Sequence, residues 1–259
     1  MYGISALGLA VLPIVTNWVS EIVKNVWLGG VGSISGDAIL ALVLLVLIIL
    51  AAIWMFVRLS SALLRVHIRS VAVTPHAALI TLMSDQSNLT LDESTSRWQY
   101  NNQEMPAGLD DICDSRRIIP GLKWQQNLRA ARHHRAVLKW ICLVGSGGPK
   151  GSAKDLAVAA KLFQTYFPGT IIVTTLTDGA PDFENLEETR NALLKVIDDC
   201  PYEEKDIVID ITGGQKTASV AAALVTLDRR DLVFQYVGTG DRSDTIFGFN
   251  AQTLGQDGR

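Results

Sequence analysis

Residues 207–219 read IVIDITGGQKTAS, and this stretch decides the fold class. The apolar run 207–211 predicts a buried strand, and the paired glycines Gly213 and Gly214 predict a tight turn. The alanine-rich run that begins near Lys216 predicts a helix. A buried strand that turns directly into a helix is the repeating unit of α/β folds with a parallel sheet.

The same pattern repeats from residue 70 onward. Strands are predicted at 78–83, 140–144, 170–176, 207–211 and 232–237, with a short edge strand at 246–249. Helices are predicted between them at 122–138, 152–166, 185–198 and 216–228. Residues 85–120 are polar and irregular, which predicts a surface excursion or lid. The predicted fold class is therefore α/β, a Rossmann-like domain with a parallel sheet.

The first sixty residues carry most of the excess hydrophobicity of the chain. Residues 38–57 form an apolar run of about 20 residues, which at about 1.5 Å per residue matches the hydrocarbon core of a bilayer. Arg58, Arg65 and Arg69 follow this run, whereas the loop before it carries no Lys or Arg. The sequence thus predicts a transmembrane helix at 38–57 whose C-terminal side is cytoplasmic.

Residues 4–27 predict a second helix with a polar face formed by Asn17, Ser20, Glu21 and Lys24. Two interpretations remain open. The helix spans the membrane with its polar face toward protein or water, or it lies in the membrane interface as an amphipathic helix. In the first interpretation these four residues are candidates to line a polar path across the membrane.

The predicted organisation is a membrane region at 1–60, a linker at 61–70, a sensor domain at 71–251 and a flexible tail at 252–259. Residues 58–70 are expected to continue as a helix into the sensor domain. The expected location is the inner membrane of a bacterial or archaeal cell, with the sensor domain in the cytoplasm.

Charge and cysteine content exclude several classes of protein. The net charge of −3 argues against direct binding of DNA or long RNA, which usually requires a basic surface. Cys113, Cys142 and Cys200 lack the paired spacing of a zinc site and form no disulfide framework. We therefore expect no metal, no cofactor and a reducing compartment.

Polar residues follow three of the predicted strands, where ligands of open sheets bind. The candidate ligand-binding residues are Ser84, Asp85, Gln86, Gly145, Ser146, Thr212, Gly213, Gly214, Gln215, Lys216 and Thr217. Free N–H groups at the start of the helix after Gly214 favour an anion, and Lys216 adds a full positive charge. The stretch is not a nucleotide triphosphatase P-loop, because Asp210 stands where the first glycine is required and Gln215 precedes the lysine.

The run Asp210-Ile-Thr-Gly-Gly-Gln-Lys-Thr217 resembles the Asp-x-Thr-Gly-Gly-x-Lys motif of CRISPR-associated Rossmann-fold (CARF) sensor domains. The likeness covers residues 70–250 and is supported by the polar end of the first strand at Ser84 and Asp85. It implies a homodimer or higher homo-oligomer that binds a cyclic oligoadenylate, with cyclic tetra-adenylate as the expected ring. Such rings are second messengers in type III CRISPR antiviral defence.

Three functions follow from this resemblance and from the apolar N-terminal region. The first is a ligand-gated effector that acts on the lipid bilayer, for example by opening a pore. The second is an enzyme that cleaves its own cyclic ligand, and the third is a membrane receptor that recruits a partner. Arg129 and His134 match the Arg-x4-His spacing of HEPN ribonucleases, but they lie on a predicted crossover helix of the sheet. No catalytic residue is therefore assigned.

Overall fold

The computed structural model describes residues 24, 43, 45–56, 66–175, 179–229, 231–238 and 245–253. The chain divides into two compact units, Met1–Leu64 and Arg65–Arg259. In the first unit, residues 45–56 form a helix. The large apolar side chains of this helix from Val46 to Phe56 are exposed.

The structure contradicts the prediction that helices span the membrane before the α/β domain. Among the helices that the structure describes, none combines the length and the apolar character needed to cross a bilayer, so this part of the predicted fold class is wrong. Asn17, Ser20 and Glu21, with most of the predicted helix 4–27, lie outside the described residues. Lys24 is helical and exposed.

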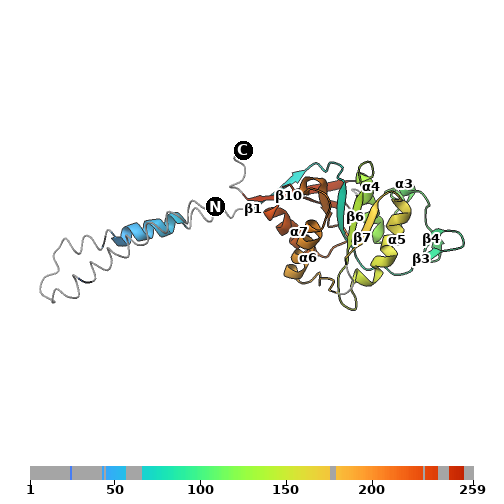
Figure 1. The fold of residues 1–259 in the computed structure, drawn as a ribbon, viewed down its shortest axis with the longest axis horizontal. Coiled ribbons are helices and arrows are strands. Elements are labelled where there is room, and N and C mark those ends of the chain that lie inside the picture. Colours follow the sequence, from blue (N-terminus) through green and yellow to red (C-terminus); the bar gives the residue numbers. More distant parts are fainter. Residues whose placement is uncertain are drawn as a thin grey trace. The chain divides into compact units, whose positions relative to one another are not determined.

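The unit Arg65–Arg259 is an α/β fold (Figure 1). Its described strands are β1 (Val66–Val71), β2 (Ala78–Leu82), β3 (Leu89–Asp92), β4 (Arg97–Tyr100), β5 (Gln103–Glu104), β6 (Trp140–Val144), β7 (Ile171–Thr174), β8 (Ile207–Asp210), β9 (Val233–Val237) and β10 (Ile246–Thr253). Its described helices are α3 (Leu109–Ile112), α4 (Trp124–His134), η1 (Ser152–Asp155), α5 (Leu156–Tyr166), α6 (Leu186–Asp198), η2 (Glu204–Asp206) and α7 (Lys216–Asp228).

The main sheet is mixed, which corrects the expectation of a parallel sheet. Its strand order is β1-β10-β9-β8-β2-β6-β7. The strands β7, β6, β2, β8 and β9 are parallel and occupy the predicted positions, whereas β10 runs antiparallel to both β9 and β1. With β2 counted as the first parallel strand, the order 3-2-1-4-5 is that of dinucleotide-binding folds.

Helices cover both faces of the sheet (Figure 1). On one face, α4 and α5 bury a core that contains Trp124, Leu128 and Phe163. On the other face, α6 and α7 bury a second core, in which Leu193 and Ala221 pack near the strands. Every residue of β2, β6 and β8 is buried, as expected for strands covered on both faces.

Three further segments differ from the sequence analysis. Residues 66–70 belong to β1 and not to a helix that continues from residue 58. The excursion at 85–120 is not irregular, because it contains α3 and a small sheet in the order β3-β4-β5. The strand β10 reaches Thr253, beyond the expected end of the domain at residue 251, and residues 254–259 lie outside the described residues.

Candidate functional site

The carboxyl ends of β2 and β8 lie side by side in the centre of the sheet. From β2 the sheet continues through β6 to β7, whereas from β8 it continues the other way through β9. Ligands of open α/β sheets bind at such a switch point, outside the carboxyl ends of the strands. The loops after β2, β6 and β8 therefore form the candidate site.

Asp210, the last residue of β8, is fully buried and fixes the loop that follows it. Its Oδ1 accepts a hydrogen bond from the Thr212 hydroxyl at 2.5 Å. Its Oδ2 accepts from the Thr81 hydroxyl at 2.7 Å and from Asn127 Nδ2 at 3.3 Å. The Thr212 hydroxyl also accepts from the backbone N–H of Val237 at 2.9 Å. Thr212 thus joins β8 to β9, and its hydroxyl is engaged in hydrogen bonds within the fold.

Gly213 and Gly214 let the loop pack directly on the end of β2. A Cβ atom at Gly213 would lie 2.2 Å from the carbonyl oxygen of Leu82. At Gly214 it would lie 2.8 Å from Leu82 Cδ1, a side-chain atom that can move. Gly213 is therefore required for the close contact with β2, whereas a side chain at Gly214 would need the Leu82 side chain to move.

The helix α7 begins directly after this loop with Lys216. Gln215 is its N-cap, and neither a capping side chain nor an acidic residue is present in the described first turn. Gln215 and Lys216 are exposed, and Thr217 is half-buried. The start of α7 therefore offers backbone N–H groups, the positive end of the helix dipole and a lysine to an anion.

The loop after β6 packs against the start of η1. A Cβ atom at Gly145 would lie 2.7 Å from the Cα of Ala153, so the close approach requires glycine. The Ser146 N–H donates to the Ser152 hydroxyl at 2.9 Å, and the Ser152 N–H donates to the Ser146 hydroxyl at 3.1 Å. The Ser152 hydroxyl donates to the carbonyl of Met83 at 2.6 Å, which ties this loop to the end of β2.

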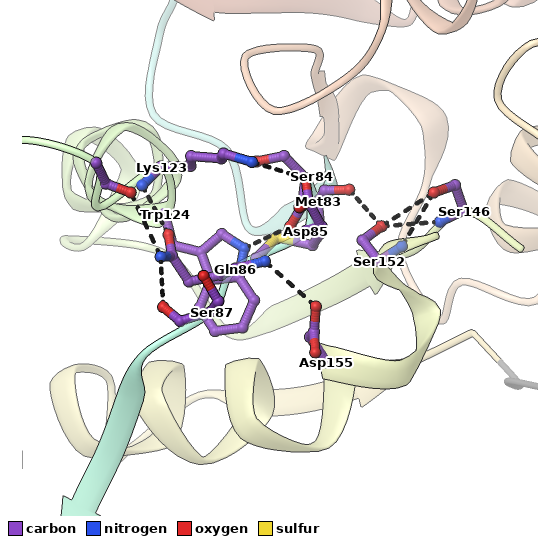
Figure 2. A network of polar contacts seen from close by, with 11 residues as sticks. Met83, Ser84, Asp85, Gln86, Ser87, Lys123, Trp124, Ser146, Ser152 and Asp155 are labelled. Carbon is purple, nitrogen blue, oxygen red and sulfur yellow. Dashed lines mark hydrogen bonds and ion pairs between the residues drawn. The ribbon is translucent and has the colours of Figure 1, made fainter. Parts of the chain in front are cut away.

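Figure 2 shows the polar network around the loop after β2. The carbonyl of Ser84 accepts from Trp124 Nε1 at 2.7 Å, and Asp85 pairs with Lys123 Nζ at 2.7 Å. Both members of this pair are about half exposed. The hydrogen bond from Lys123 is the main reason that the pKa of Asp85 lies below its usual value.

Gln86 is buried and connects two helices of the same face (Figure 2). Its Oε1 accepts from the backbone N–H of Lys123 at 2.8 Å, and its backbone N–H donates to Asp155 Oδ2 at 3.2 Å. Its Nε2 donates to the carbonyls of Ser87 and Gly121. Gln86 was predicted to bind ligand, but its side chain bonds the segment that leads into α4, while its backbone N–H bonds η1.

A pocket of about 460 Å³ lies next to this edge of the sheet. It brings together two predicted site residues from different loops, Ser146 and Gln215. The other lining residues are Gly147, Gly148, Pro149, Lys150, Gly151, Ala180, Asp182, Glu184 and Glu188. Glu188 accepts from Asn185 Nδ2 at 2.8 Å and from the Asp182 N–H at 3.1 Å, so this carboxylate is engaged at the start of α6.

Sequence reasoning missed several basic residues of the site. Lys123 precedes α4, Lys154 lies on η1 and also lowers the pKa of Asp85, and Lys150 lines the pocket. Lys123 is paired with Asp85, whereas Lys150, Lys154 and Lys216 add positive charge from the segments after β6 and β8. Lys150 could have been found in the sequence, because it follows a glycine-rich turn after a predicted strand. Within the described ranges, no group of three His, Cys, Asp or Glu residues is placed to hold a metal ion.

No family model matches the chain. An uncharacterized protein of Aquifex aeolicus (strain VF5) is 29% identical over 167 residues, which cover 62% of this chain and 52% of that protein. The chain thus spans about half the length of the relative that it matches.

Proposed function

We propose that the unit Arg65–Arg259 is a sensor domain that binds a cyclic oligoadenylate at the carboxyl ends of β2, β6 and β8. One observation carries the proposal. The uncapped start of α7, with Lys216, follows a glycine loop that packs on β2 at the switch point of the sheet. Backbone N–H groups and a lysine in this arrangement suit the phosphates of a nucleotide ring.

The identity of the ligand rests on the resemblance of residues 210–217 to the CARF motif. In this proposal two copies of the chain face each other across a twofold axis and share one ring, for which cyclic tetra-adenylate is the first candidate. The role is sensing in type III CRISPR antiviral defence. Because such a messenger is made inside the cell, the proposed location of this unit is the cytoplasm of a bacterium or archaeon.

The contacts in the structure divide the predicted site residues into two groups. Thr212, Ser146 and Gln86 have side chains engaged within the fold, and we assign them to positioning the loops. Gln215 and Lys216 are exposed at the start of α7, and we assign them to the ligand. The proposal concerns the sensor unit alone and assigns no pore to the chain.

Lys216→Ala is expected to weaken binding of the cyclic oligoadenylate by about 1–3 kcal/mol, the scale of a charge-assisted hydrogen bond. The measurement is isothermal titration calorimetry of the full chain with rings of several sizes. Lys205→Ala is the matched control, because Lys205 lies on η2 at the opposite end of β8 and pairs with Glu203 at 2.6 Å. This control should bind as tightly as the wild-type chain.

Two results would count against the proposal. If no ring size binds the wild-type chain, the ligand is wrong. If a ring binds but Lys216→Ala and Lys205→Ala have equal affinity, the ligand lies elsewhere. Chromatography of the titrated ligand tests the enzyme alternative, since cleavage products would reveal a chain that degrades its own messenger.

A further inference from the structure

Four aromatic rings form a continuous stack on β9 and β10. Phe234 and Phe249 pack with ring centroids 5.5 Å apart, and Tyr236 and Phe247 with centroids 5.0 Å apart. Tyr236 also stacks on Phe249 at 6.0 Å with an interplanar angle of 7°. The rings are therefore nearly parallel, and the stack runs from one cross-strand pair to the next.

The inner end of this stack is anchored in the core, and its outer end is open. Phe234 is 6% exposed and packs in the core beneath α6 and α7. Tyr236 is 36% exposed, and Phe247 is half-buried. The pairing of β1 with β10 ends at Gly248, so no β1 residue lies in register with Phe247. Phe234 is buried and Phe249 is partly buried against the same core, so these two rings support the two outer rings.

The open end lies beside the loop of the proposed phosphate site. The N–H of Ile211 donates to the carbonyl of Gln235 at 2.9 Å, and the N–H of Val237 donates to the Thr212 hydroxyl at 2.9 Å. Tyr236 stands between these two anchored residues at the carboxyl end of β9. Its side chain points to the face that carries α7, because residues alternate along a strand and Phe234 is on that face.

We propose that Tyr236 and Phe247 form a stacking platform for an adenine base of the ligand whose phosphates bind at Lys216. This inference rests on the proposed function and extends it from the phosphates to the base. A nucleotide offers a flat apolar surface next to a charged backbone, and the site offers rigid rings next to a helix start with a lysine. Bases stack on aromatic side chains in this way in many single-stranded nucleic acid sites.

The test compares binding of cyclic tetra-adenylate and of inorganic tripolyphosphate, which has phosphates but no base. Tyr236→Leu and Phe247→Leu keep apolar bulk and remove the ring. Each is expected to weaken binding of cyclic tetra-adenylate about 5- to 150-fold, the range seen when a base loses its aromatic partner. Tyr236→Phe retains the ring and should keep wild-type affinity. Binding of tripolyphosphate should be unchanged in all three variants.

The outcomes separate this inference from the function on which it rests. If cyclic tetra-adenylate binds and Lys216→Ala weakens it while both leucine variants bind normally, the platform is wrong and the phosphate site stands. If the leucine variants instead change the oligomeric state in sedimentation and leave affinity unchanged, the rings form a protein contact and the inference is overturned. If the wild-type chain binds no cyclic oligoadenylate, the proposed function and the platform both fail. Thermal unfolding of each variant shows whether a loss of affinity is caused by misfolding. Tyr236→Trp keeps an aromatic ring of larger size, and it should still bind cyclic tetra-adenylate even if the leucine variants misfold.

Discussion

Gly213→Ala is expected to destabilise the domain by about 3 kcal/mol, the upper end of the usual cost of overpacking a tight site. The added methyl group would lie 2.2 Å from the carbonyl oxygen of Leu82, and a backbone atom in the central strand β2 cannot move aside easily. The loop must shift instead, and the start of α7 shifts with it. Ligand affinity should therefore fall together with stability. Urea unfolding and calorimetry measure the two effects.

Gly169→Ala is the matched control for this substitution. No atom lies within 4 Å of a Cβ built at Gly169, so the methyl group meets open space. Stability should be unchanged or slightly higher, because alanine restricts the unfolded chain more than glycine does. Equal stability of the Gly213 and Gly169 variants would show that the loop does not rest on β2 in the way described above.

A second large effect is expected at Asp210, as a dependence of stability on pH. Burial raises the pKa of this carboxyl from 3.8 to about 6, although hydrogen bonds from Thr212 and Thr81 oppose the change. Because the pKa of Asp210 is higher in the folded state, the protonated carboxyl makes its full contribution to stability below pH 4. This contribution is lost as the pH rises through about 6. One pKa unit corresponds to about 1.4 kcal/mol, so the contribution changes by about 3 kcal/mol across this window.

Asp210→Asn separates this effect from the other titrating groups. His134 acts in the opposite sense, because burial lowers its pKa from 6.5 to about 3 and its contribution is lost as pH falls below 6.5. His134 is present in both proteins, so the difference between wild-type and Asp210→Asn unfolding free energies between pH 4 and pH 7 reports on Asp210. Parallel pH profiles for the two proteins would contradict the raised pKa.

The central part of the fold could be predicted from the sequence, because its strands are short apolar runs bounded by polar loops. The run 140–144 and the helix 216–228 have the bounds that the structure gives to β6 and α7. By contrast, β1 was predicted as part of a helix. Its sequence VHIRSV contains two basic residues and has exposed positions, and its conformation depends on pairing with β10, which is remote in sequence.

The small sheet at 89–104 was missed although its sequence contains a recognisable turn. Asn101 and Asn102 both have positive φ angles, 50° and 61°, and they join β4 to β5 as a two-residue connection. Asparagine tolerates this conformation and is common in such hairpin turns. The flanking strands β4 and β5 are short and polar, so they show too little alternation of apolar and polar residues to identify the turn as part of a hairpin.

Only the part of the candidate site that is contiguous in sequence could be predicted. Gly213, Gly214 and Lys216 were identified because they follow a strand within a few residues. Asn127 and Lys123 were not, because the excursion between β2 and α4 separates them from the strand that they serve. The spacing of nearby residues in the sequence identifies a loop, but the residues that hydrogen-bond to that loop lie in distant parts of the chain.

The position of β10 has a consequence for synthesis on the ribosome. This strand lies between β1 and β9, so the first strand of the sheet pairs with the last, from Val66 with Thr253 to Val71 with Gly248. Until residue 253 has left the exit tunnel, β1 lacks this pairing and β9 presents an open edge to other nascent chains. The seven-stranded sheet is therefore completed only after β10 has emerged. Slower translation of the codons for β10 would lengthen the time during which β1 and β9 each expose an unpaired edge.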